Sequence, residues 1–360
     1  MRVCLISPGA TSLFFPDSPP AHGGAETQFY LIARELARRP AFDVHMIVNG
    51  AWRHPPETRD GIALHFMPFT PGLNAKIRFQ RLLFAIGAEA YLQRGVGSLT
   101  KEIAFFCLWR RRRFFYWMSS DLEADPTINA MGVDRAASFV WGMLRADTIV
   151  AQTRRQAETL KARYGRDSLV IPNGFPPRDR PPGPRDGVLW VGRFIRLKRP
   201  ELFIELARRT PEEHFVMLAP TPQRAEAREF LERWKPQMDG LPNLEHNPGV
   251  SLDETQGFFD RAKLLVNTSE YEGFPNTFVQ AMWSATPIAS LKFDPDGAIA
   301  ERGLGVAPAR DFDAFAQQAA ALLRDPARLA QCGANAYARA QSHHDLAKNV
   351  SLLVSRVLAP

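Results

Sequence analysis

The segment from residue 269 to residue 282 places an acidic side chain directly before a helix. It reads Ser-Glu-Tyr-Glu-Gly-Phe-Pro-Asn-Thr-Phe-Val-Gln-Ala-Met, and we expect the helix to open at Pro275 and Asn276. The backbone N–H groups and positive dipole end of a helix start suit a phosphate, while Glu272 can accept hydrogen bonds from hydroxyls. A ligand that is both an anion and a polyol would use both features. Simple capping of the helix by Glu272 is the alternative.

A second segment, residues 187–200, places two cationic side chains between a strand and a helix. An apolar run is followed by Gly192, Arg193 and Lys198, and a helix is predicted from Pro200 to Arg209. A guanidinium and an ammonium group at this junction can neutralise the charge that grows on a diphosphate leaving group. Considered alone, the same spacing is more common in a solvated basic turn.

Together the two segments resemble the retaining glycosyltransferases of family 4, whose C-terminal domains carry Gly-Arg…Lys and, further on, a Glu-x7-Glu element. Glu272 stands at the first glutamate position, whereas Gln280 occupies the second. The resemblance implies that position 280 contacts the ribose of a nucleotide; an amide can accept and donate hydrogen bonds there but brings no charge. Residues 23–26, Gly-Gly-Ala-Glu, extend the resemblance toward the N-terminus.

The resemblance implies an α/β protein of GT-B fold, with two doubly wound parallel-sheet, Rossmann-like domains facing a cleft. It further implies a retaining hexosyltransferase that needs no metal ion or other cofactor. In such an enzyme Arg193 and Lys198 would stabilise the departing diphosphate, and Glu272 would position the transferred sugar. The residues expected to bind the donor are Gly23, Gly24, Gly192, Gly273, Phe274, Pro275, Asn276, Thr277 and Gln280.

The expected donor is a UDP- or GDP-sugar, and the expected acceptor is a saccharide or a lipid-linked saccharide used in cell-surface polysaccharide or glycolipid synthesis. Two alternatives remain. A nucleotide-sugar epimerase can share the architecture, and a non-catalytic nucleotide-sugar-binding subunit would explain the neutral Gln280.

Length and composition predict two domains. The chain has 360 residues, 45% hydrophobic and 23% charged, which is ordinary for a globular protein of two cores. We expect an N-terminal acceptor-binding domain at 1–172, a proline-rich linker at 173–186 and a C-terminal nucleotide-sugar-binding domain at 187–342. Residues 343–360 predict a helix, which crosses back to the N-terminal domain in the resembling family; the residues leave open whether it does so here.

Strand-like runs alternate with helical ones in both halves, the pattern of a parallel sheet. The predicted strands are Val3–Ser7, Val44–Val48, Ile62–Phe66, Phe114–Met118, Thr148–Ala151, Val188–Val191, Phe215–Leu218, Leu264–Asn267 and Ile288–Leu291. A helix is predicted at Ala25–Arg39 after the long connection Pro8–Gly24, where Gly23 and Gly24 would let backbone amides approach a ligand. After the strand at 114–118, Asp121 is expected to orient the acceptor hydroxyl, with a structural turn as the alternative.

Residues 76–113 form a basic amphipathic stretch. Its cations are Lys76, Arg78, Arg81, Arg94, Lys101 and Arg110 to Arg113, interleaved with aromatic and aliphatic residues. This pattern suits an anionic membrane surface, and the net charge of +7 agrees with it. No nucleic-acid motif accompanies the charge, so no nucleic-acid partner is expected. A solvated basic face over a buried apolar one is the leading alternative.

The remaining signals concern compartment and metals. Cys4, Cys107 and Cys332 are far apart and odd in number, which favours a reducing compartment. No signal peptide or membrane-spanning run is recognisable, so we expect a cytoplasmic protein, peripheral on the inner face of the membrane if it binds lipid. Two Asp-x-Asp spacings, at 294–296 and 311–313, are interpreted as a turn and a helix cap rather than as metal ligands.

Overall fold

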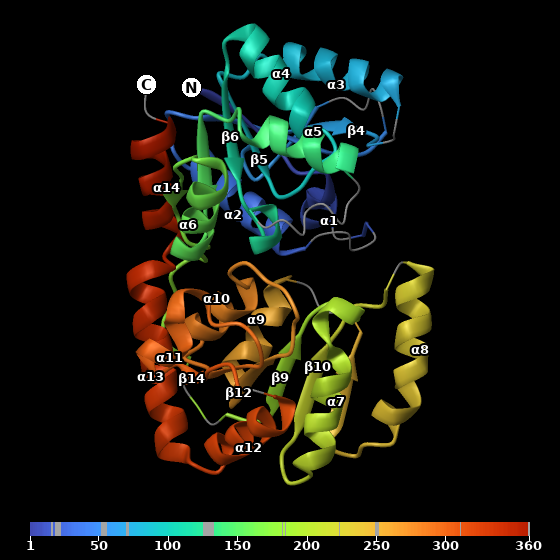
Figure 1. Ribbon diagram of the computed structural model, residues 1–360, viewed down its shortest axis with the longest axis vertical. Helices are drawn as coiled ribbons and strands as arrows, with labels where there is room; N and C mark the ends of the chain where they lie inside the picture. The colour runs from blue at the N-terminus through green and yellow to red at the C-terminus, as the bar shows by residue number, and fades with distance from the viewer. Residues whose placement is uncertain are drawn as a thin grey trace. The chain divides into compact units, whose positions relative to one another are not determined.

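The computed structural model describes residues 1–358 except 16, 19–22, 52–55, 70–71, 125–132, 182, 184, 223, 249–251 and 310. Its contacts divide the chain into two compact units (Figure 1). The first consists of Met1–Gly174 with Leu346–Pro360, and the second of Phe175–Asp345. The chain therefore leaves the first unit after Gly174, within the proline-rich segment at which the sequence predicts a linker.

The first unit is built on an eight-stranded sheet in the order β3-β4-β2-β1-β5-β6-β7-β8. All neighbours are parallel except β3, which pairs antiparallel with β4. Its strands are β1 (Arg2–Ile6), β2 (Asp43–Asn49), β3 (Glu57–Arg59), β4 (Ile62–Met67), β5 (Ala90–Arg94), β6 (Arg113–Trp117), β7 (Thr148–Ala151) and β8 (Leu169–Val170). Its longer helices are α2 (Gly24–Ala37), α3 (Leu73–Ile86), α4 (Thr100–Arg110), α5 (Val133–Met143), α6 (Arg154–Tyr164) and α14 (Leu346–Leu353). Shorter turns are η1 (Pro8–Ala10), α1 (Thr11–Phe14), η2 (Asp121–Glu123) and the π-helical turn η6 (Val354–Leu358).

Strand β5 divides the stretch that the sequence predicts to be one basic amphipathic region. Its five residues, Ala-Tyr-Leu-Gln-Arg, are all buried, with β1 on one side and β6 on the other. A central parallel strand is covered on both faces, so it lacks the alternation by which a strand is recognised from sequence. The prediction for residues 76–113 is therefore corrected to helix α3, strand β5 and helix α4.

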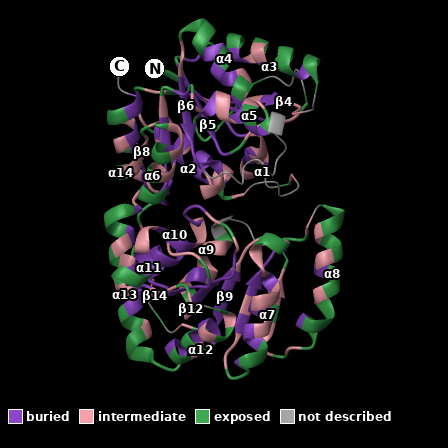
Figure 2. Cartoon of the chain, in the orientation of Figure 1, coloured by how far each residue is buried: buried purple, intermediate pink, exposed green. Residues whose placement is uncertain are grey.

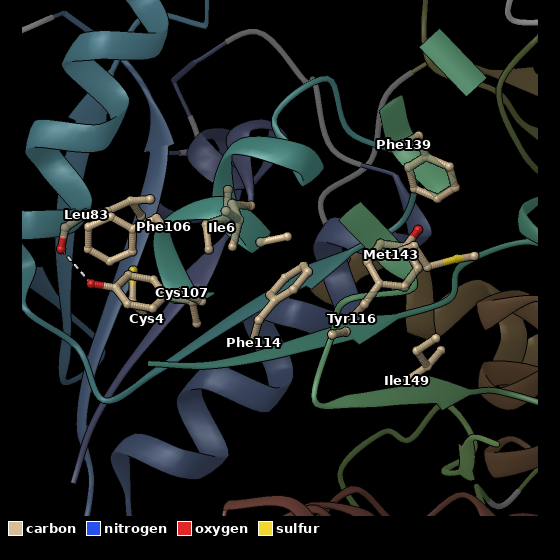
Figure 3. Close-up of a cluster of buried hydrophobic side chains, with 14 of the residues drawn as sticks. Cys4, Ile6, Leu83, Phe106, Cys107, Phe114, Tyr116, Phe139, Met143 and Ile149 are labelled. Atoms are coloured by element: carbon tan, nitrogen blue, oxygen red, sulfur yellow. Dashed lines mark hydrogen bonds between the residues drawn. The ribbon is translucent and has the colours of Figure 1, made fainter. Parts of the chain in front are cut away.

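Aromatic and sulfur-containing side chains fill the core of the first unit (Figure 3). The ring of Tyr91 packs edge-on against Phe106, with ring centroids 5.5 Å apart, and the Tyr91 hydroxyl donates to the carbonyl of Leu83 at 2.5 Å. Cys4 and Cys107 lie in the same cluster as free thiols, and burial raises the pKa of both. These cysteines are packing residues, inert because they are buried as thiols.

The C-terminal segment packs into the first unit. Helix α14 lies against α2, and Arg39 donates to the carbonyl of Ala347 at 3.2 Å and to the hydroxyl of Ser351 at 3.0 Å. Further along, Arg113 donates to the carbonyls of Val357 and Leu358 at 3.4 and 3.2 Å. Residues 347–358 are thus held by side chains from the first third of the chain.

The second unit contains a six-stranded parallel sheet in the order β11-β10-β9-β12-β13-β14. Its strands are β9 (Val188–Val191), β10 (Phe215–Leu218), β11 (Leu244–Asn247), β12 (Leu264–Asn267), β13 (Ile288–Ser290) and β14 (Gly305–Val306). Its helices are α7 (Pro200–Arg209), α8 (Ala225–Asp239), α9 (Leu252–Arg261), α10 (Asn276–Trp283), α11 (Ala298–Arg302), α12 (Phe312–Leu323) and α13 (Pro326–His343), with the short turns η4 (Arg196–Lys198) and η5 (Pro295–Gly297).

Buried side chains of strands β9, β10, β12, β13 and β14 and of the helices beside them form one core in the second unit. Phe203 of α7 packs against Phe215 of β10 at 5.3 Å and against Trp190 of β9 at 6.4 Å between ring centroids. The prediction of two parallel-sheet α/β domains is confirmed. Among the described helices, none combines the length and apolar character of a membrane span.

Candidate functional site

The second sheet changes its winding direction between two neighbouring strands, β9 and β12. From β9 the chain continues outward to β10 and β11, and from β12 it continues the opposite way to β13 and β14. In open parallel sheets, ligands bind outside the carboxyl ends of the strands at such a position. The two segments singled out from the sequence, after Val191 and after Asn267, both begin there.

The two segments are joined by an ion pair between Lys198 and Glu272. The Lys198 Nζ donates to Glu272 Oε1, and the two side chains keep 21% and 14% of their exposure. Backbone contacts hold the same segments together, since the Thr268 hydroxyl donates to the Lys198 carbonyl at 2.7 Å and the Glu270 amide donates to the Leu197 carbonyl at 2.9 Å. Residues 74 positions apart in the chain thus form one polar centre.

A second ionic group supports the first, and it is not predicted from the sequence. Arg199 contacts the carboxylates of Glu201 and Glu270, and Lys292 donates to Glu270 at 2.7 Å. The hydrogen bond from Lys292, helped by Arg199, lowers the pKa of the Glu270 carboxyl. The signal available in the sequence is that Arg199 and Glu270 flank the two predicted residues, at positions 198 and 272.

Gly192 and Arg193 differ in what surrounds them. A Cβ atom on Gly192 would lie 3.0 Å from the indole ring of Trp190, so packing against that ring explains the glycine. Trp190 in turn donates from its indole N–H to the Thr268 hydroxyl at 3.0 Å. Arg193 is exposed, and its guanidinium makes no hydrogen bond or ion pair with the part of the chain that the structure describes. This cation can turn toward an incoming anion.

Helix α10 begins as the sequence predicts, directly after Pro275. Pro275 is the extended N-cap residue, and no side chain of the described residues caps the helix. Gly273, Phe274 and Pro275 are buried, and the Phe274 ring packs against that of His344 at 4.7 Å, so these residues anchor the loop. Asn276 and Thr277 are partly exposed. The first turn of α10 is therefore the part of this segment that a ligand can approach.

Gln280 lies one turn into α10, on the same side of the helix as Asn276. It retains 5% of its exposure, and its backbone carbonyl accepts a hydrogen bond from Gln256 at 3.3 Å. The acidic Asp294, which follows the next strand, accepts hydrogen bonds from the amides of Ile299 and Ala300 at 2.6 and 3.0 Å. Asp294 therefore caps α11.

The predicted residues of the first unit have partners within that unit. The Gly23 amide donates to the Glu26 carboxylate at 2.8 Å, closing a capping box at the start of α2. Asp121 accepts from the Gln156 side chain at 2.9 Å and lies 4.0 Å from the Arg155 guanidinium. Both contacts stabilise local structure, so ligand contact by Gly23 would replace a bond that the structure already contains.

A buried polar cluster near Asp121 is not predicted from the sequence. Glu123 is fully buried and accepts from the Tyr116 hydroxyl at 2.6 Å, from the Ser119 hydroxyl and amide at 2.6 and 2.9 Å, and from the Ser120 amide at 2.9 Å. Burial raises the pKa of this carboxyl. The signal in the sequence is the Ser-Ser-Asp-Leu-Glu turn, whose second acidic residue, Glu123, is the buried one.

Arg94, at the end of β5, is the counter-charge of this cluster. It is 9% exposed, donates to the Asn173 side chain at 2.5 Å, and lies over the Trp117 ring with its guanidinium carbon 5.2 Å from the centroid. Burial lowers the pKa of Arg94 to about 10. The expectation that Arg94 belongs to a basic surface is wrong, because the strand that carries it is central in the sheet.

Neither Asp-x-Asp spacing holds its carboxylates together as a metal site would. Asp311 accepts from the Ala314 amide at 2.9 Å and caps α12, and Asp313 pairs with Arg209 at 2.6 Å. Among the described residues, no group of three or more His, Cys, Asp or Glu side chains is placed to hold a metal ion.

Known proteins are similar to this chain in part of its sequence and in its fold. Residues 185–325 match the model of the family described as Glycosyl transferases group 1. No curated protein sequence matches the chain. Among solved structures, sucrose-phosphate synthase from Thermosynechococcus elongatus is similar with a TM-score of 0.80 and 17% identity, over 99% of each chain.

Two further structures show how widely the fold is shared. Anabaena Alr3699/HepE in complex with UDP-glucose has a TM-score of 0.78 and 14% identity over 99% of each chain. A Listeria monocytogenes protein named as a UDP-N-acetylglucosamine 2-epimerase has a TM-score of 0.64 and 11% identity, covering 100% of this chain and 97% of that one. The chain thus has the GT-B fold, and its second unit carries the segment that matches the glycosyl transferases group 1 family.

Proposed function

We propose that the protein is a retaining glycosyltransferase that moves a sugar from a nucleotide-sugar to an acceptor hydroxyl without a metal ion. The observation that carries the proposal is the meeting of Lys198 and Glu272 where the second sheet changes direction, inside the segment that matches the family. A cation and a carboxylate in contact, beside the start of α10, supply partners for a diphosphate and for sugar hydroxyls at one place.

Each group has a separate part in the proposed reaction. Lys198 and Arg193 neutralise the negative charge that develops on the diphosphate as the glycosidic bond breaks. Glu272 accepts hydrogen bonds from the hydroxyls of the transferred sugar, and the first turn of α10, with Asn276 and Thr277, holds a donor phosphate. The departing phosphate oxygen takes the proton of the acceptor hydroxyl as the new bond forms on the same face of the sugar. No protein nucleophile is needed.

For the donor we propose a UDP-sugar ahead of a GDP-sugar, because HepE, which is similar over its whole length, was solved with UDP-glucose. Gln280 would contact the ribose, and Asp121 would orient the acceptor hydroxyl. The acceptor is a saccharide or a lipid-linked saccharide for a cell-surface polymer or glycolipid. The reaction would take place in the cytoplasm, and at the inner face of the membrane if the protein binds lipid.

An epimerase is the second candidate, since a protein named as a UDP-N-acetylglucosamine 2-epimerase shares the fold over its whole length. The two activities differ in product. A transferase releases free nucleotide diphosphate and does so faster with acceptor, whereas an epimerase converts the sugar and leaves the nucleotide attached. A non-catalytic binding subunit would bind the donor and yield neither product.

The experiment that tests the proposal has two stages. A thermal-shift panel of UDP-, GDP-, ADP- and dTDP-sugars identifies the donor, because a ligand that binds only the folded state raises its stability by mass action. Product analysis with the stabilising donor then follows, with and without saccharide acceptors. Release of nucleotide diphosphate with transfer to an acceptor supports the proposal; conversion of the sugar without release, or binding without turnover, overturns it.

A further inference from the structure

Large apolar side chains are concentrated on one exposed part of the first unit. Among the described residues nine large hydrophobic side chains are exposed, and seven of them fall between positions 73 and 109. These seven are Leu73, Ile77, Phe84, Val96, Phe105, Leu108 and Trp109. Scattered single residues of this kind need no explanation, but a cluster indicates a surface that binds something.

Six of the seven lie on two helices in contact, α3 and α4, whose exposed positions are coloured green in Figure 2. On α3, Leu73, Ile77 and Phe84 are spaced by four and seven residues, so they share one side of the helix, away from the buried side that includes Phe79 and Leu83. On α4, Phe105, Leu108 and Trp109 likewise share one side of the helix, away from its buried side. These six residues are called the α3–α4 face below.

An arginine connects the two rows of this face. The guanidinium carbon of Arg110 lies 4.8 Å from the ring centroid of Phe84 on α3 and 5.2 Å from that of Trp109 on α4. The cation thus stands among the apolar groups rather than apart from them. A side chain so placed can reach a charged headgroup while the rings beside it enter an apolar layer.

Exposed cations lie beside the six apolar residues of the α3–α4 face. Residues 73–113 contain nine Lys and Arg against two Glu, a net charge of +7, which equals the net charge of the full chain. One of the two carboxylates, Glu102, is paired with Lys76 at 2.5 Å. Arg94 is buried in β5 and Arg113 donates to the C-terminal carbonyls, so neither contributes to the outer surface. The exposed cations are Lys76, Arg78, Arg81, Lys101, Arg110 and Arg111.

We propose that the α3–α4 face docks the protein on an anionic lipid surface. The apolar side chains would enter the boundary between headgroups and acyl chains, and the surrounding cations would contact the headgroup phosphates. Charge argues against a second copy of the chain, because that arrangement would bring the six exposed cations of one copy against those of the other. Nucleic acid would match the cations but would leave the six apolar side chains without a partner.

A cavity at the start of both helices adds room for a headgroup. It has a volume of about 580 Å³ and is lined by Lys76, Lys101 and Arg135 together with apolar side chains such as Phe69 and Phe139. Its size is within the range of small-molecule pockets. Two of its three cations, Lys76 and Lys101, are also among the exposed cations beside the α3–α4 face, so the same positive charges lie near the cavity and the face.

The proposal is tested by flotation of the full-length protein with vesicles. Phosphatidylcholine vesicles containing phosphatidylglycerol should carry the protein upward at low salt, and both added salt and pure phosphatidylcholine should reduce this, since the headgroup charge is then screened or missing. The assay reads binding and not sugar transfer, so it stands or falls separately from the proposed enzyme activity.

Three variants distinguish the contributions. Replacing Arg78, Arg81 and Arg110 by Gln should weaken partitioning about a hundredfold, given the usual contribution of each cation near an anionic surface. Phe105→Ser with Trp109→Ser removes apolar contact without changing the charge and should also reduce binding. The matched control replaces Arg224, Arg233 and Lys235, exposed cations on or beside α8 of the second unit, by Gln and should bind as the parent does.

Circular dichroism and melting temperature establish that the variants are folded, as expected for exposed positions. The proposal is overturned by the absence of flotation at low salt, or by equal losses in the α3–α4 variants and the α8 control. It is also overturned if sedimentation shows a dimer that the Phe105→Ser, Trp109→Ser variant dissociates, because the face would then be occupied by a second copy.

Discussion

In the second unit the chain changes direction between β9 and β12, and there Lys198 and Glu272 meet with both side chains partly exposed. In the first unit the corresponding change lies between β1 and β5, and Arg94 at the end of β5 is enclosed beside a fully buried Glu123. The corresponding positions in the two sheets thus each hold a cation and a carboxylate, but in different surroundings. Lys198 and Glu272 keep part of their exposure, whereas Arg94 and Glu123 are enclosed by protein.

The difference in burial predicts which of these residues affect turnover and which affect the stability of the fold. An ion pair that keeps part of its exposure contributes less to folding than a fully buried one, because water can solvate a charge whose partner is removed. A buried carboxylate with four hydrogen-bond donors around it cannot be removed without leaving those donors unsatisfied. We therefore expect substitutions at the end of the second sheet to change turnover, and substitutions in the Glu123 cluster to change the free energy of unfolding.

The largest effect is expected at Glu123. Glu123→Ala should lower the free energy of unfolding by about 4 kcal/mol, the scale for breaking a buried charge network. The donors left behind are the hydroxyls of Tyr116 and Ser119 and the amides of Ser119 and Ser120. Urea denaturation measures the change. Glu212→Ala, at an exposed carboxylate paired with Arg324, is the control and should change the free energy of unfolding far less. Similar losses in both variants would contradict the comparison.

For Lys198 and Arg193 we expect a large loss of turnover with little loss of stability. Either residue changed to Ala should lower kcat about a hundredfold, which corresponds to ~3 kcal/mol of lost stabilisation at the leaving group. The melting temperature should change little, because the Lys198 pair with Glu272 is partly exposed. Arg208→Ala, an exposed arginine on α7 paired with Glu205, is the matched control for activity. Unchanged turnover in both test variants would remove these residues from the mechanism.

The sequence predicts the members of the polar centre in the second unit but not its geometry. Lys198 and Glu272 each stand between a recognisable strand and a helix, so their positions at strand ends follow from local pattern. Their contact requires β9 and β12 to be neighbours, although β10 and β11 lie between them in the chain. Strand order depends on tertiary packing of the whole unit, and hydrophobic periodicity carries no information about it.

In the first unit the sequence does not predict strand β5 or the burial of Arg94, and the reason is different. Arg94 stands among nine cations, and its neighbours Tyr91 and Leu92 read as one more part of an amphipathic stretch. Burial on both faces of β5 hides the strand from a pattern that relies on alternation. The strands at Thr148–Ala151, Val188–Val191 and Phe215–Leu218 are found to the residue, because polar or turn-forming residues lie at or next to both ends of each apolar run.

Within the second unit, Glu272 is expected to affect turnover but not the binding of the bare nucleotide. Glu272→Gln keeps the shape of the side chain but removes the charge-assisted hydrogen bonds to sugar hydroxyls. The activation free energy should then rise by ~2 kcal/mol, which lowers kcat about thirtyfold. Binding of the bare nucleoside diphosphate should be nearly unchanged, because that ligand lacks the sugar. Steady-state kinetics and calorimetry measure the two quantities. Equal losses of turnover and of bare nucleotide binding would show that Glu272 acts on the nucleotide instead.

The smallest effect is expected at Gln280, one turn into α10. A carboxylate there would accept charge-assisted hydrogen bonds from a ribose diol, so Gln280→Glu should tighten nucleotide binding by ~1 kcal/mol, about fivefold. Repulsion from an acidic neighbour would give the opposite sign, but both carboxylate oxygens of Asp294 already accept amides of α11. Calorimetry with the best nucleotide of the panel decides, with the exposed Gln237→Glu as control. Tighter binding supports a ribose contact, weaker binding indicates an acidic group already beside the ribose, and no change means that position 280 does not face the nucleotide.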